Sequence, residues 1–247
     1  MVPEGSHVRA VYLQPEHGVL ATDLGSKILV DCSTIDTATS NAVREEIATR
    51  YPSARFYDAP VSGGSLGAAN ASLTLMLGAS SSDANIELLR ELLGMMGKSI
   101  FPCGGPSMGL TAKLCNNYCS GLIAIATAEA MNIGIKSGID PRILGTVFST
   151  STAQSTISDK WNPVPGICPA APSSHDYQGG FKVQLMKKDF GLAVDAADRV
   201  GAKLLLGDAG LKTYADASED PSCRDRDSRV VFRYLGGDED WAAKFAK

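Results

Sequence analysis

The feature that most constrains this chain is an almost uncharged stretch at residues 110–136. Its residues are nearly all apolar or small, and Gly138 follows at the position where a glycine commonly ends a helix. A helix of this length spans roughly 40 Å at 1.5 Å per residue. Because it has no broad polar face, it must be buried on most sides, as a central helix or within a subunit interface. The stretch therefore predicts a helical domain built on one long helix.

The composition is that of an ordinary globular protein. The 247 residues are 44% hydrophobic and 20% charged, which excludes intrinsic disorder. A net charge of -4 without long runs of one sign gives no reason to expect a nucleic-acid partner. The most apolar segment, residues 118–128, is too short to span a bilayer, so we expect no membrane partner. The 6 Cys form neither CxxC pairs nor zinc-like spacings, which indicates a reducing compartment and no metal site.

Before the long helix, β-like runs alternate with amphipathic segments. Strands and helices are predicted in turn at residues 27–31, 37–51, 55–57, 72–77 and after Asp83, the expected N-cap of the last helix. This alternation predicts an α/β domain. We place its boundary near Gly109, so that residues 1–109 and 110–247 form two domains.

After the long helix the pattern stays helical except in one stretch. Asp140 and Pro141 are a typical N-cap and first residue of a following helix. Residues 161–180 contain four Pro and several other turn formers, which predicts a long functional loop. Helical periodicity returns at residues 181–200. The second domain is therefore predicted to be all-α.

Two segments before and at the start of the long helix carry residues suited to chemistry. In DAPVSGG, residues 58–64, the backbone N–H groups of Ser62, Gly63 and Gly64 could face an anion, although a simple turn explains them on composition alone. Lys113 and Asn117 are i and i+4 on one helix face. A Lys at the mouth of an apolar cleft has a lowered pKa and can act as a general acid, while a carboxamide can orient an alcohol. A snorkelling Lys beside a solvated Asn fits the spacing equally well.

A third segment is KKD at residues 187–189. Its Lys188 could point a cation at a phosphate or carboxylate, but on spacing alone a solvated helix face is favoured. The three His residues lie too far apart in the sequence to suggest metal ligands.

Taken together and in order, these segments resemble the β-hydroxyacid dehydrogenase family over essentially the whole chain. The matching motifs are MVP at residues 1–3, DCSTID at 31–36, DAPVSGG at 58–64, GLTAKLCNN at 109–117, TAEAMNIGIKSG at 127–138, NPVPG at 162–166, YQGGF at 177–181 and KD at 188–189. Each motif alone is weak, whereas their joint order is highly specific. The resemblance implies a Rossmann-type domain followed by an all-α domain for substrate binding and dimerisation.

The resemblance also implies an activity, the reversible NAD-dependent oxidation of a 3-hydroxy acid to its semialdehyde. The first choice of substrate is 3-hydroxyisobutyrate, an intermediate of valine catabolism. By position, Lys113 is implied as the catalytic Lys and Asn117 as its helper. Ser62, Gly63 and Gly64 are implied as the cradle of the substrate carboxylate. Positive charge and N–H donors suit both this carboxylate and a developing alkoxide.

The resemblance further implies cofactor-binding residues, an oligomeric state and a cellular compartment. Val2, Pro3 and Thr34 are implied to line the nicotinamide end of the NAD site, and Lys188 to contact the cofactor from the helical domain. The family further implies a homo-oligomer that forms through the helical domain. It points to the mitochondrial matrix, with the cytoplasm as the alternative.

The sequence departs from the family pattern at its beginning. Family members open with a strand, a GxGxxG turn and a helix that bind the pyrophosphate, and this sequence contains no GxGxxG. We therefore expect a partial Rossmann-type domain that lacks its first βαβ units, starting roughly 100 residues late. Such a chain should expose a sheet edge and apolar surface, bind NAD poorly and turn over little.

A second departure lies in STAQST, residues 151–156, where the mitochondrial relatives carry a Ser-Ser-Gly segment followed by a Trp. It leaves open a sister enzyme that reduces tartronate semialdehyde, succinic semialdehyde or glyoxylate. A non-catalytic helical dimerisation module is the alternative from another class. A 6-phosphogluconate dehydrogenase is disfavoured, because its Lys is accompanied by a His and further basic groups.

Overall fold

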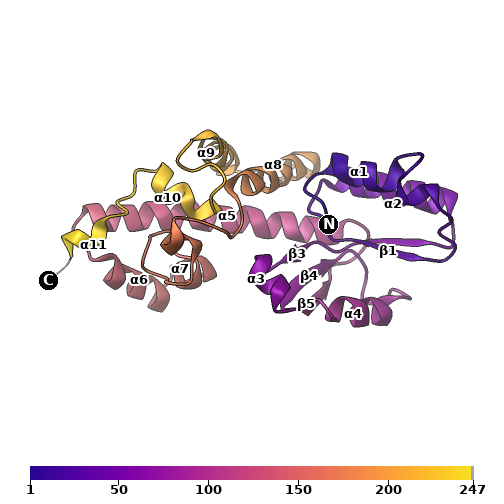
Figure 1. Cartoon of the computed structure of the whole chain (residues 1–247), viewed down its shortest axis with the longest axis horizontal. Helices are drawn as coiled ribbons and strands as arrows, with labels where there is room; N and C mark the ends of the chain where they lie inside the picture. The colour runs from indigo at the N-terminus through magenta and orange to yellow at the C-terminus, as the bar shows by residue number, and fades with distance from the viewer. Residues whose placement is uncertain (246–247) are drawn as a thin grey trace. The chain divides into compact units, whose positions relative to one another are not determined.

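The computed structural model describes residues 1–245, which form two compact units (Figure 1). The α/β unit, Met1–Asn116 with Asp195–Val200, holds all the described strands. The helical unit is the remainder of the described chain. This is the α/β domain followed by an all-α domain that the sequence predicted.

In the α/β unit, helices and strands alternate. The elements are α1 (Gly5–Leu13), η1 (Val19–Ala21), β1 (Ile28–Asp31), α2 (Thr37–Arg50), β2 (Arg55–Asp58), β3 (Val61–Ser62), α3 (Gly64–Ala69), β4 (Leu73–Leu77), α4 (Ile86–Gly94), β5 (Gly97–Pro102) and the start of α5 (Met108–Lys136). Strand β1 pairs with β2 in parallel, and β4 pairs with β3 antiparallel and with β5 in parallel. The Gly78 N–H donates to the Asp58 carbonyl at 2.7 Å and so links β2 to the end of β4.

Apolar cores lie on both faces of β2. Phe56 packs with α1 and α2, whereas the next residue, Tyr57, packs with α4, because successive side chains of a strand point to opposite faces. Val8 of α1 and Val43 of α2 are fully buried in the first core, and Leu89 of α4 is fully buried in the second. The strands are thus sandwiched between helices.

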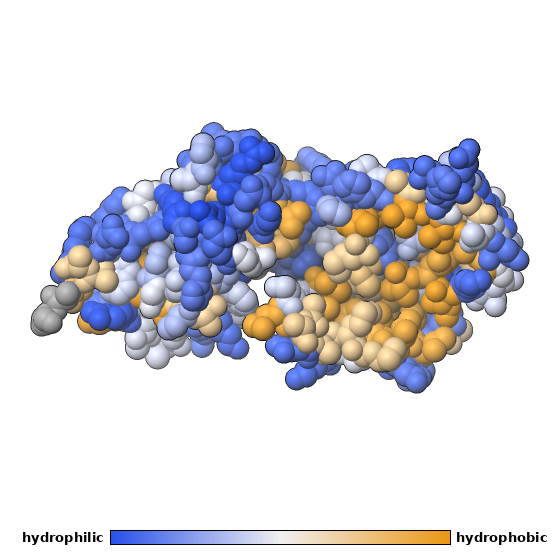
Figure 2. Space-filling model, in the orientation of Figure 1, coloured by the Kyte–Doolittle hydropathy of each residue, from blue (hydrophilic) through white to orange (hydrophobic). Residues whose placement is uncertain are grey.

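Apolar surface and one sheet edge remain open in the α/β unit. Among the described strands, β1 pairs with β2 alone, and Ile28, Leu29 and Val30 are only half-buried. Leu88 on α4 and Met95 just after it face solvent. Figure 2 shows hydrophobic residues gathered over this unit. The exposed edge and apolar surface expected from the sequence are therefore present.

The helical unit is built around the long helix α5. Its further elements are α6 (Pro141–Thr150), α7 (Thr156–Lys160), η2 (Pro172–His175), most of α8 (Val183–Val200), α9 (Gly207–Glu219), η3 (Ser228–Val230), α10 (Val231–Tyr234) and α11 (Trp241–Lys244). Helix α5 packs closely against α8 and α9 at Gly121, whose carbonyl accepts a hydrogen bond from the Tyr214 hydroxyl at 2.8 Å. The Phe190 ring lies between those of Tyr118 and Tyr214, with centroids 4.8 and 5.8 Å away.

By length and hydropathy alone, α5 could also cross a membrane. Its most apolar window has a mean hydropathy of 1.3, and 44% of the residues in that window are buried. The buried positions of α5 include Ala128 and Met131, which belong to the core of the helical unit. The central helix of a soluble protein meets the same criteria.

The helix ends bear out one sequence prediction and correct another. The Asp140 carboxylate accepts the Arg142 N–H and caps α6, as predicted. Asp83, in contrast, is not the N-cap of α4. Its carboxylate accepts the Asn85 N–H and the Tyr57 hydroxyl, both at 2.8 Å, so it forms a turn before the helix and ties that turn to β2.

The carboxylate of Asp58, at the end of β2, binds the N-terminus of α5. It accepts the N–H groups of Ser107 at 2.8 Å and Leu110 at 2.9 Å, which have no partner within the helix. A negative charge at a helix N-terminus is also favoured by the helix dipole. Burial raises the pKa of Asp58, and the backbone hydrogen bonds oppose that rise. This contact fixes where α5 starts.

The first prediction concerns this contact. We expect Asp58→Asn to lower the free energy of unfolding by about 2–3 kcal/mol. The substitution removes the charged acceptor for the Ser107 and Leu110 N–H groups, and it places an amide N–H donor against these backbone donors. Asp36→Asn is the matched control, since Asp36 caps α2 in a less buried position and Asn caps equally well there. Urea unfolding of both variants measures the difference, and equal stabilities would contradict the assigned role.

The second prediction concerns close packing in the helical unit. A Cβ at Gly210 would lie 2.4 Å from Cζ of the buried Phe190 ring, whereas one at Gly191 would meet nothing nearer than 3.7 Å. We expect Gly210→Ala to lower the melting temperature through overpacking, at a cost of about 1–3 kcal/mol. Gly191→Ala should raise it, since Ala favours helix by up to about 1 kcal/mol. Calorimetry of both variants checks the opposite signs.

Candidate active site

The glycine loop after β3 has a backbone that only glycine adopts readily. Gly63 has φ +132° and Gly64 has φ +63°, and both are exposed, next to the half-buried Ser62. A Cβ on Gly63 would lie 3.1 Å from Leu73, whereas one on Gly64 would meet nothing within 4 Å. The loop therefore leaves open space beside accessible backbone, which suits the close approach of an anion.

Lys113 lies in α5, one turn beyond the residues that Asp58 holds. Its side chain is only 7% exposed. Gly109 allows α5 to start so close to the strands, because a Cβ there would lie 2.1 Å from the Met76 carbonyl oxygen. Lys113 is thus largely shielded from solvent.

Asn117, one turn further along α5, is held by a buried carboxylate. Its Nδ2 donates to Oδ2 of Asp189 at 2.6 Å, and the two residues are 6% and 2% exposed. The other oxygen of Asp189 pairs with Nζ of Lys188 at 2.8 Å. The amide of Asn117 is therefore fixed in orientation, and Asp189 joins it to Lys188.

The segments expected at the nicotinamide end are linked at the carboxyl end of β1. The Val2 N–H donates to Oγ of Ser33 at 2.9 Å, so Val2 and Pro3 lie beside the loop that carries Thr34. Pro3 is exposed and Thr34 is half-buried. Ligands of α/β sheets bind at the carboxyl ends of strands. A nicotinamide is a flat ring that carries a polar carboxamide. The Val and Pro side chains offer apolar contacts and the Thr side chain a hydroxyl, so the residues present suit a nicotinamide.

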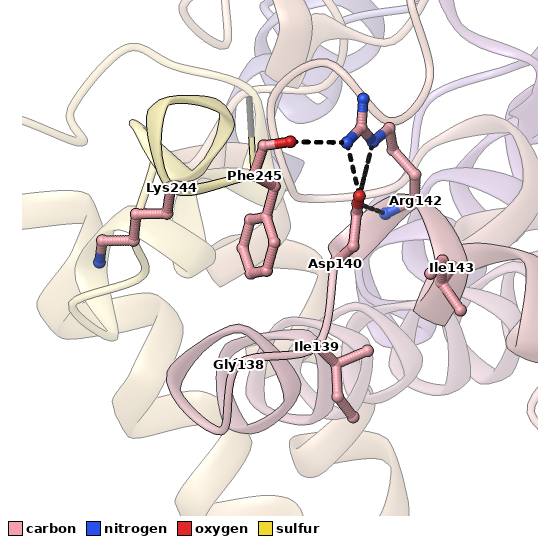
Figure 3. Close-up of a pocket in the computed structure, with 7 residues that line it drawn as sticks. All are labelled: Gly138, Ile139, Asp140, Arg142, Ile143, Lys244 and Phe245. Atoms are coloured by element: carbon pink, nitrogen blue, oxygen red, sulfur yellow. Dashed lines mark hydrogen bonds and ion pairs between the residues drawn. The ribbon is translucent and has the colours of Figure 1, made fainter. Parts of the chain in front are cut away.

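A surface cavity is present in the helical unit. It has a volume of about 760 Å³ and is bordered by Asp140, Arg142, Lys244 and Phe245 (Figure 3). The guanidinium of Arg142 bonds to the Asp140 carboxylate and to the Phe245 carbonyl. None of the residues predicted from the sequence to be functional lines this cavity.

Val2 contacts the loop of Ser33 and Thr34 at the end of β1. Asn117 and Lys188 both contact Asp189, and Lys113 shares a helix face with Asn117. Ser62, Gly63 and Gly64 form a separate loop after β3. The residues that hold these groups, Asp58, Asp189 and Ser33, were not singled out individually from the sequence. Their motifs were visible, but each partner is remote in the sequence. Among the described residues, no group of three or more His, Cys, Asp and Glu side chains could hold a metal ion.

Comparisons with known proteins match nearly the whole chain. The family model for the NAD-binding domain of NADP-dependent 3-hydroxyisobutyrate dehydrogenase matches residues 107–235. The model for the NAD-binding domain of 6-phosphogluconate dehydrogenase matches residues 1–105. These matches confirm the expected nicotinamide dinucleotide at the level of NAD(P).

Individual relatives agree with the family models. The mitochondrial 3-hydroxyisobutyrate dehydrogenase of Rattus norvegicus is 39% identical over 97% of this chain and 70% of its own length. The Pseudomonas aeruginosa enzyme of the same name is 40% identical over 84% of this chain and 68% of its own. The solved 3-hydroxyisobutyrate dehydrogenase of Mycobacterium tuberculosis with L-serine superposes with a TM-score of 0.86, at 34% identity over 95% of this chain and 77% of that chain.

The matched region is part of each relative. The chain spans 65% of the length of the Dictyostelium discoideum and Homo sapiens relatives, which are 44% and 38% identical to it. The relatives include mitochondrial and bacterial proteins. Family models, relatives and fold agree with the dehydrogenase family that the sequence motifs indicated. The chain belongs to the 3-hydroxyisobutyrate dehydrogenase family of NAD(P)-binding oxidoreductases.

Proposed function

We propose that this chain supplies the catalytic and substrate-binding residues of an NAD-dependent dehydrogenase that oxidises 3-hydroxyisobutyrate to methylmalonate semialdehyde. The observation that carries the proposal is the buried pair Lys113 and Asn117 on one face of α5, with Asn117 oriented by Asp189. L-serine, present with the Mycobacterium tuberculosis relative, is also a 3-hydroxy acid, which supports this substrate class.

Each residue then has a defined task. The N–H groups of Ser62, Gly63 and Gly64 bind the substrate carboxylate. The amine of Lys113 takes the hydroxyl proton as the alcohol becomes a carbonyl and returns it in the reverse direction. The amide of Asn117 donates to the same oxygen and stabilises its developing charge. Val2, Pro3, Thr34 and Lys188 are the residues that would hold the cofactor, and a bound nicotinamide would supply the hydride acceptor.

The same proposal assigns roles to the two domains. Residues 1–109 belong to an NAD-binding domain of Rossmann type, and residues 110–247 form the domain for substrate binding and dimerisation. We further propose a homo-oligomer in the mitochondrial matrix that uses NAD. The mitochondrial relatives support the compartment, and the long, partly exposed helix α5 supports association through the helical domain.

The direct test is oxidation of 3-hydroxyisobutyrate with NAD, followed by absorbance of the reduced cofactor. It is run on the 247-residue chain and on the same chain joined to the segment of the rat relative that lies outside the match. Activity in either form supports the proposal. Two folded but inactive proteins would overturn it and favour a helical dimerisation module, which sedimentation would then detect.

The third prediction concerns Lys113. We expect Lys113→Ala to lower kcat by about 10²–10⁴-fold in the active form, because the proton acceptor is lost. Lys136→Ala, an exposed change on the same helix, should leave kcat unchanged. Equal rates for the two variants would remove Lys113 from the reaction.

The fourth prediction concerns Asp189. We expect Asp189→Ala to lower kcat by about 10–10²-fold while the fold persists, because Asn117 loses the acceptor that fixes its amide. Asp198→Ala removes an exposed carboxylate from the same helix and should have no effect on kcat. Steady-state kinetics beside circular dichroism separates loss of orientation from loss of structure.

A further inference from the structure

A buried hydroxyl links the start of the chain to the loop after β1. Oγ of Ser33 accepts the Val2 N–H at 2.9 Å and donates to Oδ1 of Asp31 at 2.6 Å. The Ser33 N–H also donates to Oδ1 of Asp31, at 3.0 Å. Ser33 is 1% exposed and Asp31 is 5% exposed. The buried Ser33 hydroxyl thus serves as both acceptor and donor, and it joins the half-buried Val2 to the buried Asp31.

The loop alternates between anchored and accessible residues. Asp31, Ser33 and Ile35 are buried, whereas Cys32 and Thr34 are half-buried. Pro3, next to the tethered Val2, is exposed. The network therefore holds the backbone at the carboxyl end of β1, where Pro3 is exposed and Thr34 is half-buried.

The hydrogen bonds of Ser33 are suited to fixing the exact position of the Val2–Pro3 segment, beyond merely attaching it to the domain. A hydrogen bond to an ionised acceptor is shorter and stronger than one between neutral groups, and the Asp31 carboxylate also orients the hydroxyl so that its lone pair faces Val2. Packing of Val2 against the first apolar core already attaches the segment. The hydrogen bonds of Ser33 in addition set the distance between the Val2–Pro3 segment and the loop that carries Thr34.

We propose that Ser33 is a positioning residue for the cofactor, which holds the Val2–Pro3 backbone and the Thr34 loop at the spacing that receives the nicotinamide ring. The inference rests on the proposed function, because it takes this edge of β1 as the nicotinamide end. Ser33 itself is enclosed and acts only through Val2 and Thr34. Preorganised segments bind a ligand more tightly because less ordering remains to be done on binding.

The test compares two buried serines in whichever form of the protein is active in the oxidation assay. Ser33→Ala removes the tether, and Ser173→Ala removes a similarly buried hydroxyl that donates to the Asn162 carbonyl at 2.6 Å in the helical unit. NADH binding is titrated by fluorescence, and the melting temperature is measured for each. We expect NADH to bind about tenfold more weakly to Ser33→Ala. Ser173→Ala should lose stability but keep its affinity for NADH.

A second measurement needs no variant. Hydrogen exchange at the Val2 amide, followed by NMR in the ¹⁵N-labelled protein, should slow further when NADH is saturating. Unchanged NADH affinity in a folded Ser33→Ala protein, or Val2 exchange that does not respond to NADH, would overturn this inference and leave the proposed function intact. If the unaltered protein neither turns over substrate nor binds NADH, the proposed function fails, and the role of Ser33 fails with it.

Discussion

The contact between the Asp58 carboxylate and the N-terminus of α5 is the constraint on which the arrangement of the α/β unit depends. A carboxylate loses much hydration when it is buried, and this loss is offset only by good hydrogen bonds. The first turn of a helix offers N–H donors that have no partner within the helix. Gly78 and Gly109 make room for the approach, since a Cβ on either would come within 3 Å of the carboxylate. The end of a strand thereby determines where the helix carrying Lys113 begins.

Buried aspartates repeat this arrangement at other segments of interest. Asp31 orients Ser33, Asp189 orients Asn117, and Asp227 accepts the Phe181 N–H at 2.8 Å beside Arg229. In each case a buried carboxylate accepts a hydrogen bond from a donor in a loop or another helix. The apolar cores hold the elements together, but such cores tolerate small displacements of their members. A charged acceptor with a short, directional bond removes that freedom where a ligand has to be met.

Much of the fold could be predicted from local sequence, and the exceptions have physical causes. The pattern of α5 and the runs that form β1, β2 and β4 are unambiguous. Helix α1 was not predicted because its nine residues have weak helix propensity and its N-cap Glu4 makes no side-chain hydrogen bond. It is helical because Val8 and Tyr12 are buried against its neighbours. Strand β5 begins at a Gly and ends at a Pro, with only partial burial between them, so its residues do not alternate like those of a half-buried strand.

The candidate site, like the fold, could be predicted from the sequence only in part. The pair Lys113 and Asn117 is visible from the sequence, because four residues make one helical turn. The partner of Asn117 lies 72 residues away, and no local pattern encodes such a contact. The motif containing Asp189 pointed to Lys188 as the functional residue, whereas the neighbouring carboxylate makes the contact with Asn117.

The continuity of α5 has a consequence for how this family can change. Each residue advances a helix by about 100°. A single insertion or deletion between Lys113 and Asn117 would therefore turn the two side chains onto different faces. Such a change would leave the helix itself intact and its apolar character almost the same. We therefore expect variation in length to occur in loops such as the stretch between α7 and α8, and the four-residue interval within α5 to vary by substitution.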